Sequence, residues 1–111
     1  MTDPFVPVAR LADLAPGEVI DVVAGGVEIA LVRDENGGIH ALEDRCSHED
    51  VALSDGDVEG CTLECWKHGS QFDLTTGRPL QLPAVLPVAV LPVRVDETTG
   101  EIAVDPTAVS A

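Results

Sequence analysis

The stretches Cys46-Ser47-His48 and Cys65-Trp66-Lys67-His68 each pair one cysteine with one histidine, and sixteen residues lie between them. The resulting pattern, C-x-H followed by C-x-x-H, offers two thiolates and two imidazoles from two separate loops. A cluster held in this way has one iron bound only by sulfur and one iron with two nitrogen ligands, which shifts its reduction potential. The two stretches therefore predict a metal centre.

Tetrahedral zinc is the alternative for the same four residues, because two cysteines and two histidines also satisfy that ion. Zinc modules usually pair like with like, as in C-x-x-C followed later by two histidines. Each short run here instead joins one cysteine to one histidine. This spacing favours an iron–sulfur cluster, and a zinc-stabilised interaction module stays as the weaker alternative.

The residues around both pairs resemble the Rieske family. The resemblance is sharpest in Cys46–Asp50 and Cys65–Asp73, extends to Thr76-Gly77 and Pro83, and covers roughly residues 4 to 105. It implies an all-β Rieske fold, in which an antiparallel β-sandwich-like base domain carries an inserted cluster-binding subdomain. It also implies one [2Fe–2S] cluster per chain, with two cysteines on the inner iron and two histidines on the outer iron: Cys46, Cys65, His48 and His68.

Further residues near the ligands have expected roles around the cluster. Gly69 would present its backbone N–H at close range, and Ser70 stands where high-potential members place a serine hydroxyl. Trp66 would lie at the docking face or cover the cluster from water. Pro83 fits the family's proline-containing loop that closes over the cluster, or it is an ordinary turn proline.

The loop residues indicate the low-potential subtype. High-potential respiratory members carry an extra cysteine pair in these loops, whereas Glu49-Asp50 and Trp66-Lys67 occupy the loops here. Phe72 stands where those members have a tyrosine, so one hydrogen-bond donor is missing. Acidic side chains beside His48 also disfavour the addition of an electron.

Composition predicts a single domain over residues 1–111, long enough for a modest core. The inserted subdomain is expected at about 44–83, and the base domain at 1–43 and 84–111. Residues 1–10 lack the features of a signal peptide. Prolines interrupt the apolar stretch 80–95, which is too short for a membrane span. We therefore expect a soluble, cytoplasmic protein without a membrane partner.

The formal net charge of −14 disfavours nucleic acid as a partner, because six basic residues cannot supply a phosphate-binding surface. Strong acidity suits a carrier that is steered onto basic patches of redox partners. Simple solubility explains the same charge equally well.

Alternating apolar residues and turn residues predict short strands and no long helix. A short helical turn is possible at Leu11–Leu14. The strand-like runs are Glu18–Val23, Val27–Arg33, Ile39–Glu43, Gly60–Leu63, Ser70–Leu74, Val88–Val90, Val93–Val95 and Ile102–Val104.

Two further residues have chemical potential outside the motif. His40 is interpreted as a packed or exposed strand residue. Cys61 is interpreted as a small buried hydrophobe, with a redox-reactive thiol as the alternative.

The resemblance implies a one-electron carrier that is not itself an enzyme. Its expected partners are a flavoprotein ferredoxin reductase and a terminal non-haem iron oxygenase. The alternative is a redox accessory of iron–sulfur cluster assembly, with assembly proteins as partners. The sequence does not separate these two roles.

Overall fold

The computed structural model describes residues 4–44, 52–65, 71–80 and 88–107. These ranges contain ten β-strands, two short 3₁₀ helices and no long helix, as the sequence predicts. Within them, no helix is long and apolar enough to cross a membrane. The elements are β1 (Val6–Arg10), η1 (Leu11–Asp13), β2 (Glu18–Ala24), β3 (Val27–Arg33), β4 (Ile39–Glu43), η2 (Leu53–Asp55), β5 (Asp57–Glu59), β6 (Thr62–Glu64), β7 (Gln71–Asp73), β8 (Val90–Leu91), β9 (Val93–Asp96) and β10 (Glu101–Val104).

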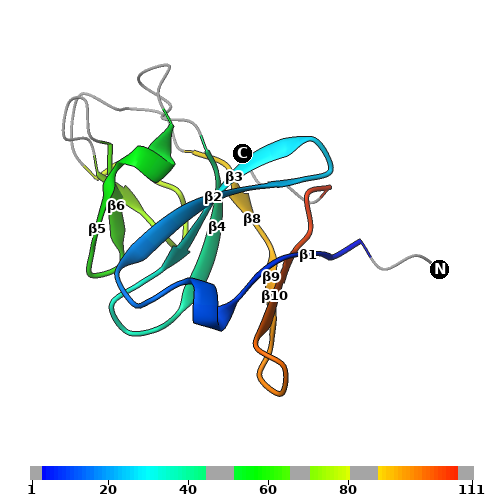
Figure 1. Cartoon of the computed structure of the whole chain (residues 1–111). Coiled ribbons are helices and arrows are strands. Elements are labelled where there is room, and N and C mark those ends of the chain that lie inside the picture. The colour runs from blue at the N-terminus through cyan, green and yellow to red at the C-terminus, as the bar shows by residue number, and fades with distance from the viewer. Residues whose placement is uncertain (1–3, 45–51, 66–70, 81–87, 108–111) are drawn as a thin grey trace.

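The strands form three antiparallel sheets (Figure 1). Sheet A has the order β1-β10-β9, sheet B has the order β2-β3-β4-β8, and sheet C has the order β5-β6-β7. In Figure 1 sheet B lies between the other two, with sheet C at the left and sheet A at the right. The predicted all-β architecture is confirmed.

Sheet B is built from the predicted alternation of apolar residues. Strands β2 and β3 pair along their whole length, and Gly25 and Gly26 join them with φ angles of 57° and 80°. Both angles are positive, as a tight hairpin turn between twisted strands requires. The four consecutive residues Ile29 to Val32 are all buried, so β3 contacts apolar neighbours on both of its faces.

Each face of sheet B belongs to a different hydrophobic core, because successive side chains of a strand point to opposite sides. The face with Ile29 and Leu31 packs into what we call the terminal-strand core. The face with Ala30 and Val32 packs into the ligand-side core. The terminal-strand core comprises Leu14, Ala24, Ile29, Leu31, Ala41, Leu91, Ile102 and Val104; the ligand-side core comprises Ala30, Val32, Leu42, Leu53, Leu63, Cys65, Phe72, Leu74 and Val88.

Sheet C is inserted between two neighbouring strands of sheet B. Strands β4 and β8 pair directly, with Ala41 opposite Leu91 and Leu42 opposite Val90. All three strands of sheet C lie between them in the sequence. The chain thus leaves sheet B, forms sheet C and returns beside its point of departure. The predicted subdomain limits at 44 and 83 stay a prediction, since 81–87 lie outside the described residues.

Sheet C differs in detail from the strands predicted for it. A strand was expected over Gly60–Leu63, and these limits were wrong, because β6 spans Thr62–Glu64; no strand was predicted at β5. Gly60 has a φ of 58° and lies in the turn that joins these two strands. Pairing with β6 therefore makes β5 a strand, although its residues resemble a polar turn.

Candidate metal centre

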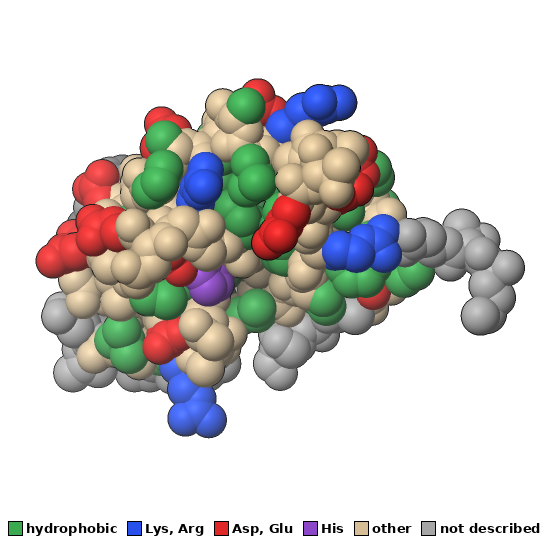
Figure 2. All heavy atoms as spheres, turned by 90° about the horizontal axis from the view of Figure 1, so that it is seen from below, with side chains coloured by type: hydrophobic (Ala, Val, Ile, Leu, Met, Phe, Trp, Pro, Cys, Tyr) green, Lys and Arg blue, Asp and Glu red, His purple; other side chains and the backbone are tan. Residues whose placement is uncertain are grey.

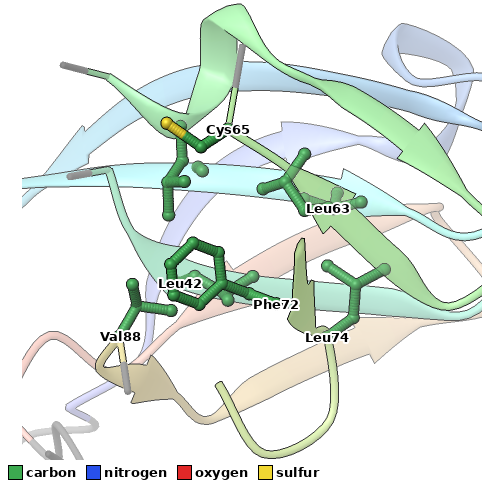
Figure 3. Packing of buried hydrophobic residues seen from close by; sticks show 9 residues of the cluster. Leu42, Leu63, Cys65, Phe72, Leu74 and Val88 are labelled. Carbon is green, nitrogen blue, oxygen red and sulfur yellow. The ribbon is translucent and has the colours of Figure 1, made fainter. Parts of the chain in front are cut away.

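Cys65 is the one predicted ligand that lies within the described residues. It directly follows β6, has no solvent exposure, and belongs to the ligand-side core beside Leu63 and Phe72 (Figure 3). The other three ligands, Cys46, His48 and His68, lie outside the described ranges, as do Trp66, Gly69, Ser70 and Pro83. What the structure does define is how the ends of the ligand-bearing segments are held.

The second ligand segment, 65–70, connects two paired strands. Glu64, the last residue of β6, lies opposite Gln71, the first residue of β7. Their side chains also interact, with Gln71 Nε2 lying 3.4 Å from Glu64 Oε2. The ladder therefore fixes both ends of the segment that carries Cys65 and His68.

A buried carboxylate ties together the two ends of the first ligand segment, 45–51. The backbone N–H of Ser54 donates to Asp44 Oδ1 at 2.7 Å, and the Ser54 hydroxyl donates to Asp44 Oδ2 at 2.6 Å. The backbone N–H of Asp44 donates to the carbonyl of Glu28 in β3 at 2.9 Å. Hydrogen bonds to a charged acceptor are stronger than neutral ones, so this carboxylate is a firm anchor for the segment.

The residues that flank 81–87 are held next to β7 and to the segment that follows it. The N–H of Leu80 donates to the carbonyl of Gln71 at 2.7 Å, and the N–H of Val88 donates to the carbonyl of Gly77 at 2.8 Å. A Cβ atom at Gly77 would collide with the Val88 carbonyl oxygen. Glycine is therefore needed for the close approach of these two backbones.

The bases of the ligand segments also contact one another. Gly56 follows η2, and a Cβ atom there would collide with the backbone carbonyl of Glu64, the residue before Cys65. The N–H of Glu43, just before the first segment, donates to the carbonyl of Ala89, just after 81–87, at 2.9 Å. The residues that flank 45–51, 65–70 and 81–87 consequently lie in one neighbourhood of the described fold.

The donors present fit an iron–sulfur cluster. The thiolate is the form of cysteine that binds metals. Cys65 is completely buried at a fixed strand end, whereas Cys61 is exposed. An arrangement with one inner, water-excluded sulfur ligand on an anchored segment suits the all-sulfur iron of a mixed-ligand cluster.

His40 and Cys61 lie close together, although they are far apart in the sequence and were interpreted separately. His40 lies in β4, so its prediction as a strand residue is confirmed, and its Nε2 lies 2.7 Å from Asp34 Oδ2. Cys61 was predicted to be buried, and this was wrong, because the residue lies exposed in the β5–β6 turn. Its sulfur lies 3.9 Å from Asp34 Oδ2.

The same contacts perturb the buried carboxyl group of Asp34. The hydrogen bond with His40 is the main cause that lowers the pKa of Asp34, and the N–H groups of Gly38 and Asn36 lower it further. Burial acts in the opposite direction without reversing the result. Asp34 is thus held as a carboxylate at the end of β3. No sequence motif marks this trio, because its members come from separate turns and strands.

The comparison with known protein families separates the two interpretations of the ligand set, an iron–sulfur cluster or zinc. The family model of the Rieske [2Fe-2S] domain matches residues 4–92. The chain belongs to the Rieske [2Fe–2S] family. For this Rieske chain, the match favours the iron–sulfur interpretation of the ligand set over the zinc interpretation, and it confirms the predicted [2Fe–2S] cofactor.

Curated relatives and solved structures show which members of the Rieske family this chain is similar to. The Rieske chain is 36% identical over 96 residues to the ferredoxin component of the naphthalene 1,2-dioxygenase/salicylate 5-hydroxylase systems of Ralstonia sp., covering 86% of this chain and 91% of that protein. The ferredoxin of carbazole 1,9a-dioxygenase from Nocardioides aromaticivorans IC177 superposes with a TM-score of 0.85 and 38% identity, covering 92% of this chain and 97% of that one.

A third match is a chain from a complex of reduced oxygenase and oxidized ferredoxin in carbazole 1,9a-dioxygenase. Its TM-score is 0.83 at 31% identity, and 94% of each chain is covered. These relatives confirm the predicted Rieske fold and the predicted role as an electron carrier rather than an enzyme.

Proposed function

We propose that this Rieske ferredoxin takes single electrons from a flavoprotein ferredoxin reductase and delivers them to a terminal non-haem iron oxygenase. Support comes from the relatives, which are ferredoxin components of dioxygenase systems. The match to a chain from an oxygenase–ferredoxin complex supports an oxygenase as the acceptor. The same relatives favour this role over the alternative role in cluster assembly.

We assign Cys46 and Cys65 to the inner iron, and His48 and His68 to the outer iron. The burial of Cys65 carries this proposal, because an inner thiolate must be shielded from water. The bound cluster supplies a one-electron couple, at about −150 to +300 mV for Rieske centres against about −400 mV for plant-type clusters. The roles of Gly69, Ser70, Trp66 and Pro83 around the cluster stay predictions from the sequence.

The chain's own residues position and shield this centre. The ligand-side core packs Phe72 and Leu63 around Cys65 and so excludes water from the inner ligand. The Asp44 carboxylate and the β6–β7 ladder hold the ends of both ligand segments. A formal charge of −14 steers the protein onto basic surfaces of its partners, which raises the rate of encounter.

Matched cysteine variants test the ligand assignment. Cys65→Ser should lose the rhombic EPR signal of the reduced protein together with the bound iron, because serine does not replace an inner thiolate. Cys61→Ser makes the same change four residues earlier at an exposed position and should retain both. A Cys65→Ser protein with full iron content and an unchanged signal would overturn the assignment.

Reconstitution with a ferredoxin reductase and a terminal oxygenase of a dioxygenase system tests the proposed role. Substrate oxidation should depend on adding the ferredoxin, and the rate should fall as ionic strength rises, because the docking surface is charged. Equal oxidation without the ferredoxin would contradict the proposal.

A further inference from the structure

Three side chains of types that bind metals meet outside the predicted ligand set, and their exposure runs from the buried Asp34 to the exposed Cys61. Asp34 follows β3, His40 lies in β4, and Cys61 lies in the turn between β5 and β6. One donor atom from each lies within 4.8 Å of the others. Figure 2 shows a histidine side chain, coloured purple, that reaches the surface of the face in view. The trio therefore joins sheet B to sheet C at a place that an ion from solution can reach.

The distances are close to those of a metal site. His40 Nε2 lies 2.7 Å from Asp34 Oδ2, and Cys61 Sγ lies 3.9 Å from the same oxygen. Tetrahedral zinc with bonds of about 2.0 to 2.3 Å places its donor atoms roughly 3.4 to 3.6 Å apart. The His40–Asp34 separation would have to widen, and the Cys61–Asp34 separation to shorten, each by about 1 Å or less to reach this spacing, and all three donor atoms already lie within 4.8 Å of one another.

Neighbouring backbone groups already orient the carboxylate. The N–H groups of Asn36 and Gly38 both donate to Asp34 Oδ1 at 2.9 Å, which leaves Oδ2 directed at His40 and Cys61. A Cβ atom at Gly38 would lie only 2.8 Å from Oδ2. Hydrogen bonds of this kind fix the orientation of a ligand before the metal binds.

The two turns that carry the donors are also joined to each other. The N–H of Glu35 donates to the carbonyl of Gly60 at 3.3 Å, next to Cys61. Thr75 places its hydroxyl oxygen 3.8 Å from the Cys61 sulfur. A zinc ion with these three protein ligands would take water as its fourth ligand, as in zinc sites that have three protein ligands.

We propose that Asp34, His40 and Cys61 bind one zinc ion at a site separate from the iron–sulfur cluster. Thiolate, imidazole and carboxylate together select a borderline-soft ion such as zinc over magnesium or calcium. On binding, the Cys61 thiol releases its proton to the solvent, and the neutral His40 ring carries its proton on Nδ1 instead of Nε2, so that Nε2 offers its lone pair to the ion. The hydrogen bond between His40 and Asp34 then gives way to two metal bonds. The zinc charge is balanced by the carboxylate and the thiolate.

Zinc at this position links the β3–β4 turn to the β5–β6 turn, four residues before Cys65. The ion would thereby brace sheet C against sheet B at the base of the second ligand segment. We expect bound zinc to raise the unfolding temperature of the protein, because an ion that binds only the folded state stabilises it.

The test uses the holoprotein with its cluster fully assembled, incubated with zinc chloride and desalted. We expect one retained zinc per chain with unchanged iron content. At the zinc K-edge, X-ray absorption should show one sulfur at about 2.3 Å and nitrogen or oxygen ligands at about 2.0 to 2.2 Å. Iron does not contribute at this edge.

Cys61→Ser should remove the sulfur shell and weaken zinc affinity by at least about 100-fold, since even outer-shell partners change affinity 10- to 100-fold. His40→Gln should weaken affinity similarly while retaining the sulfur. Glu59→Gln, an exposed change in the same turn region, is the matched control and should bind zinc like the wild type.

Three results would overturn the proposal. The first is the absence of retained zinc in the wild type. The second is zinc uptake that occurs only with loss of iron, which would place the ion at the cluster ligands. The third is a Cys61→Ser protein that keeps wild-type affinity and an unchanged sulfur shell. The rise in unfolding temperature with zinc, present in the wild type and absent in Cys61→Ser, provides a readout independent of affinity.

Discussion

The two faces of sheet B support different kinds of core. The terminal-strand core is closed by side chains from β10 and from the segments near the N-terminus, and only apolar groups complete it. The ligand-side core is closed by strands of three residues each and contains Cys65. On that side the same packing that stabilises the fold also positions a ligand. A defect in the ligand-side core should therefore disturb the cofactor, whereas a defect in the terminal-strand core should disturb stability alone.

Replacing one matched leucine in each core by alanine should have the largest effect and tests the difference between the two cores most directly. Leu42 and Leu31 are both fully buried in sheet B, but they belong to the ligand-side core and the terminal-strand core respectively. Each change to alanine should lower the free energy of unfolding by about 2 to 5 kcal/mol. Only Leu42→Ala should also speed cluster loss, which is measured as the bleaching of visible absorbance in native buffer. Equal bleaching rates for both variants would show that the two cores are not functionally distinct.

Two glycine variants test the contact at the base of the ligand segments. Gly56 has a φ of −88°, so alanine fits the backbone there, but its Cβ would collide with the Glu64 carbonyl. Overpacking of this kind costs about 1 to 3 kcal/mol, and here it pushes β6 and Cys65 outward.

Gly60 is the control for Gly56, because it has a φ of 58° and no atom lies within 4 Å of the position that an added Cβ would take. Gly60→Ala should cost about 1 to 2 kcal/mol from backbone strain alone and leave the EPR line shape unchanged. Gly56→Ala should change the line shape. Thermal melting and EPR of both variants check this, and an altered spectrum in Gly60→Ala alone would contradict the predicted difference.

Two buried aspartates provide a smaller test. Asp44 accepts two hydrogen bonds from Ser54, ten residues away, whereas Asp105 accepts two from Thr107, two residues away. Asp44→Ala should cost about 1.5 to 3 kcal/mol, because it removes charge-assisted bonds that bridge the first ligand segment. It should also raise hydrogen exchange of the Ser54 amide and speed cluster loss.

Asp105→Ala serves as the control on the terminal-strand side of the molecule. Its bonds are local, so the expected cost is about 1 kcal/mol, with cluster lifetime unchanged. If this variant lost its cluster as fast as Asp44→Ala, the bridging role of Asp44 would be refuted.

The smallest expected effect concerns acid stability at Asp34. The pKa of this carboxyl is lowered from 3.8 in the folded protein, mainly by the hydrogen bond with His40. Its contribution is therefore complete above pH of about 3.8 and is lost as the pH falls through the lowered folded-state pKa. Asp34→Asn removes the titrating group, so the acid limb of the stability curve should become shallower, by about 1 kcal/mol in total.

His40→Gln should flatten the same acid limb, because His40 is the largest cause of the shift. Denaturant melts between pH 3 and pH 6 in zinc-free buffer measure both variants. An acid limb as steep in Asp34→Asn as in the wild type would mean that this carboxyl does not contribute to acid unfolding.

Sequence patterns predicted β2, β3 and β4 of sheet B well and sheet C poorly. The last strand of sheet B was misplaced, because it was expected at Val88–Val90 and β8 spans Val90–Leu91. In sheet B, long alternating runs and the Gly25-Gly26 turn carry enough local information to set strand and register. In sheet C, each strand has three residues, and the polar β5 exists because β6 offers it a partner. Cys61 was misassigned for the same reason: moving a strand boundary by two residues transferred it from a buried strand to an exposed turn.

By itself, the sequence determined the type of main site. Ligand type and spacing are local properties, so the mixed cysteine and histidine pairs predicted a metal centre, and the resemblance of the residues around them to the Rieske family implied the [2Fe–2S] cluster that the family match supports. Only the tertiary structure decided which side chains meet across the sheets. It buried Cys65, anchored the ligand segments through Asp44, and brought Asp34, His40 and Cys61 together. Such contacts join residues up to 27 positions apart, and no local pattern encodes them.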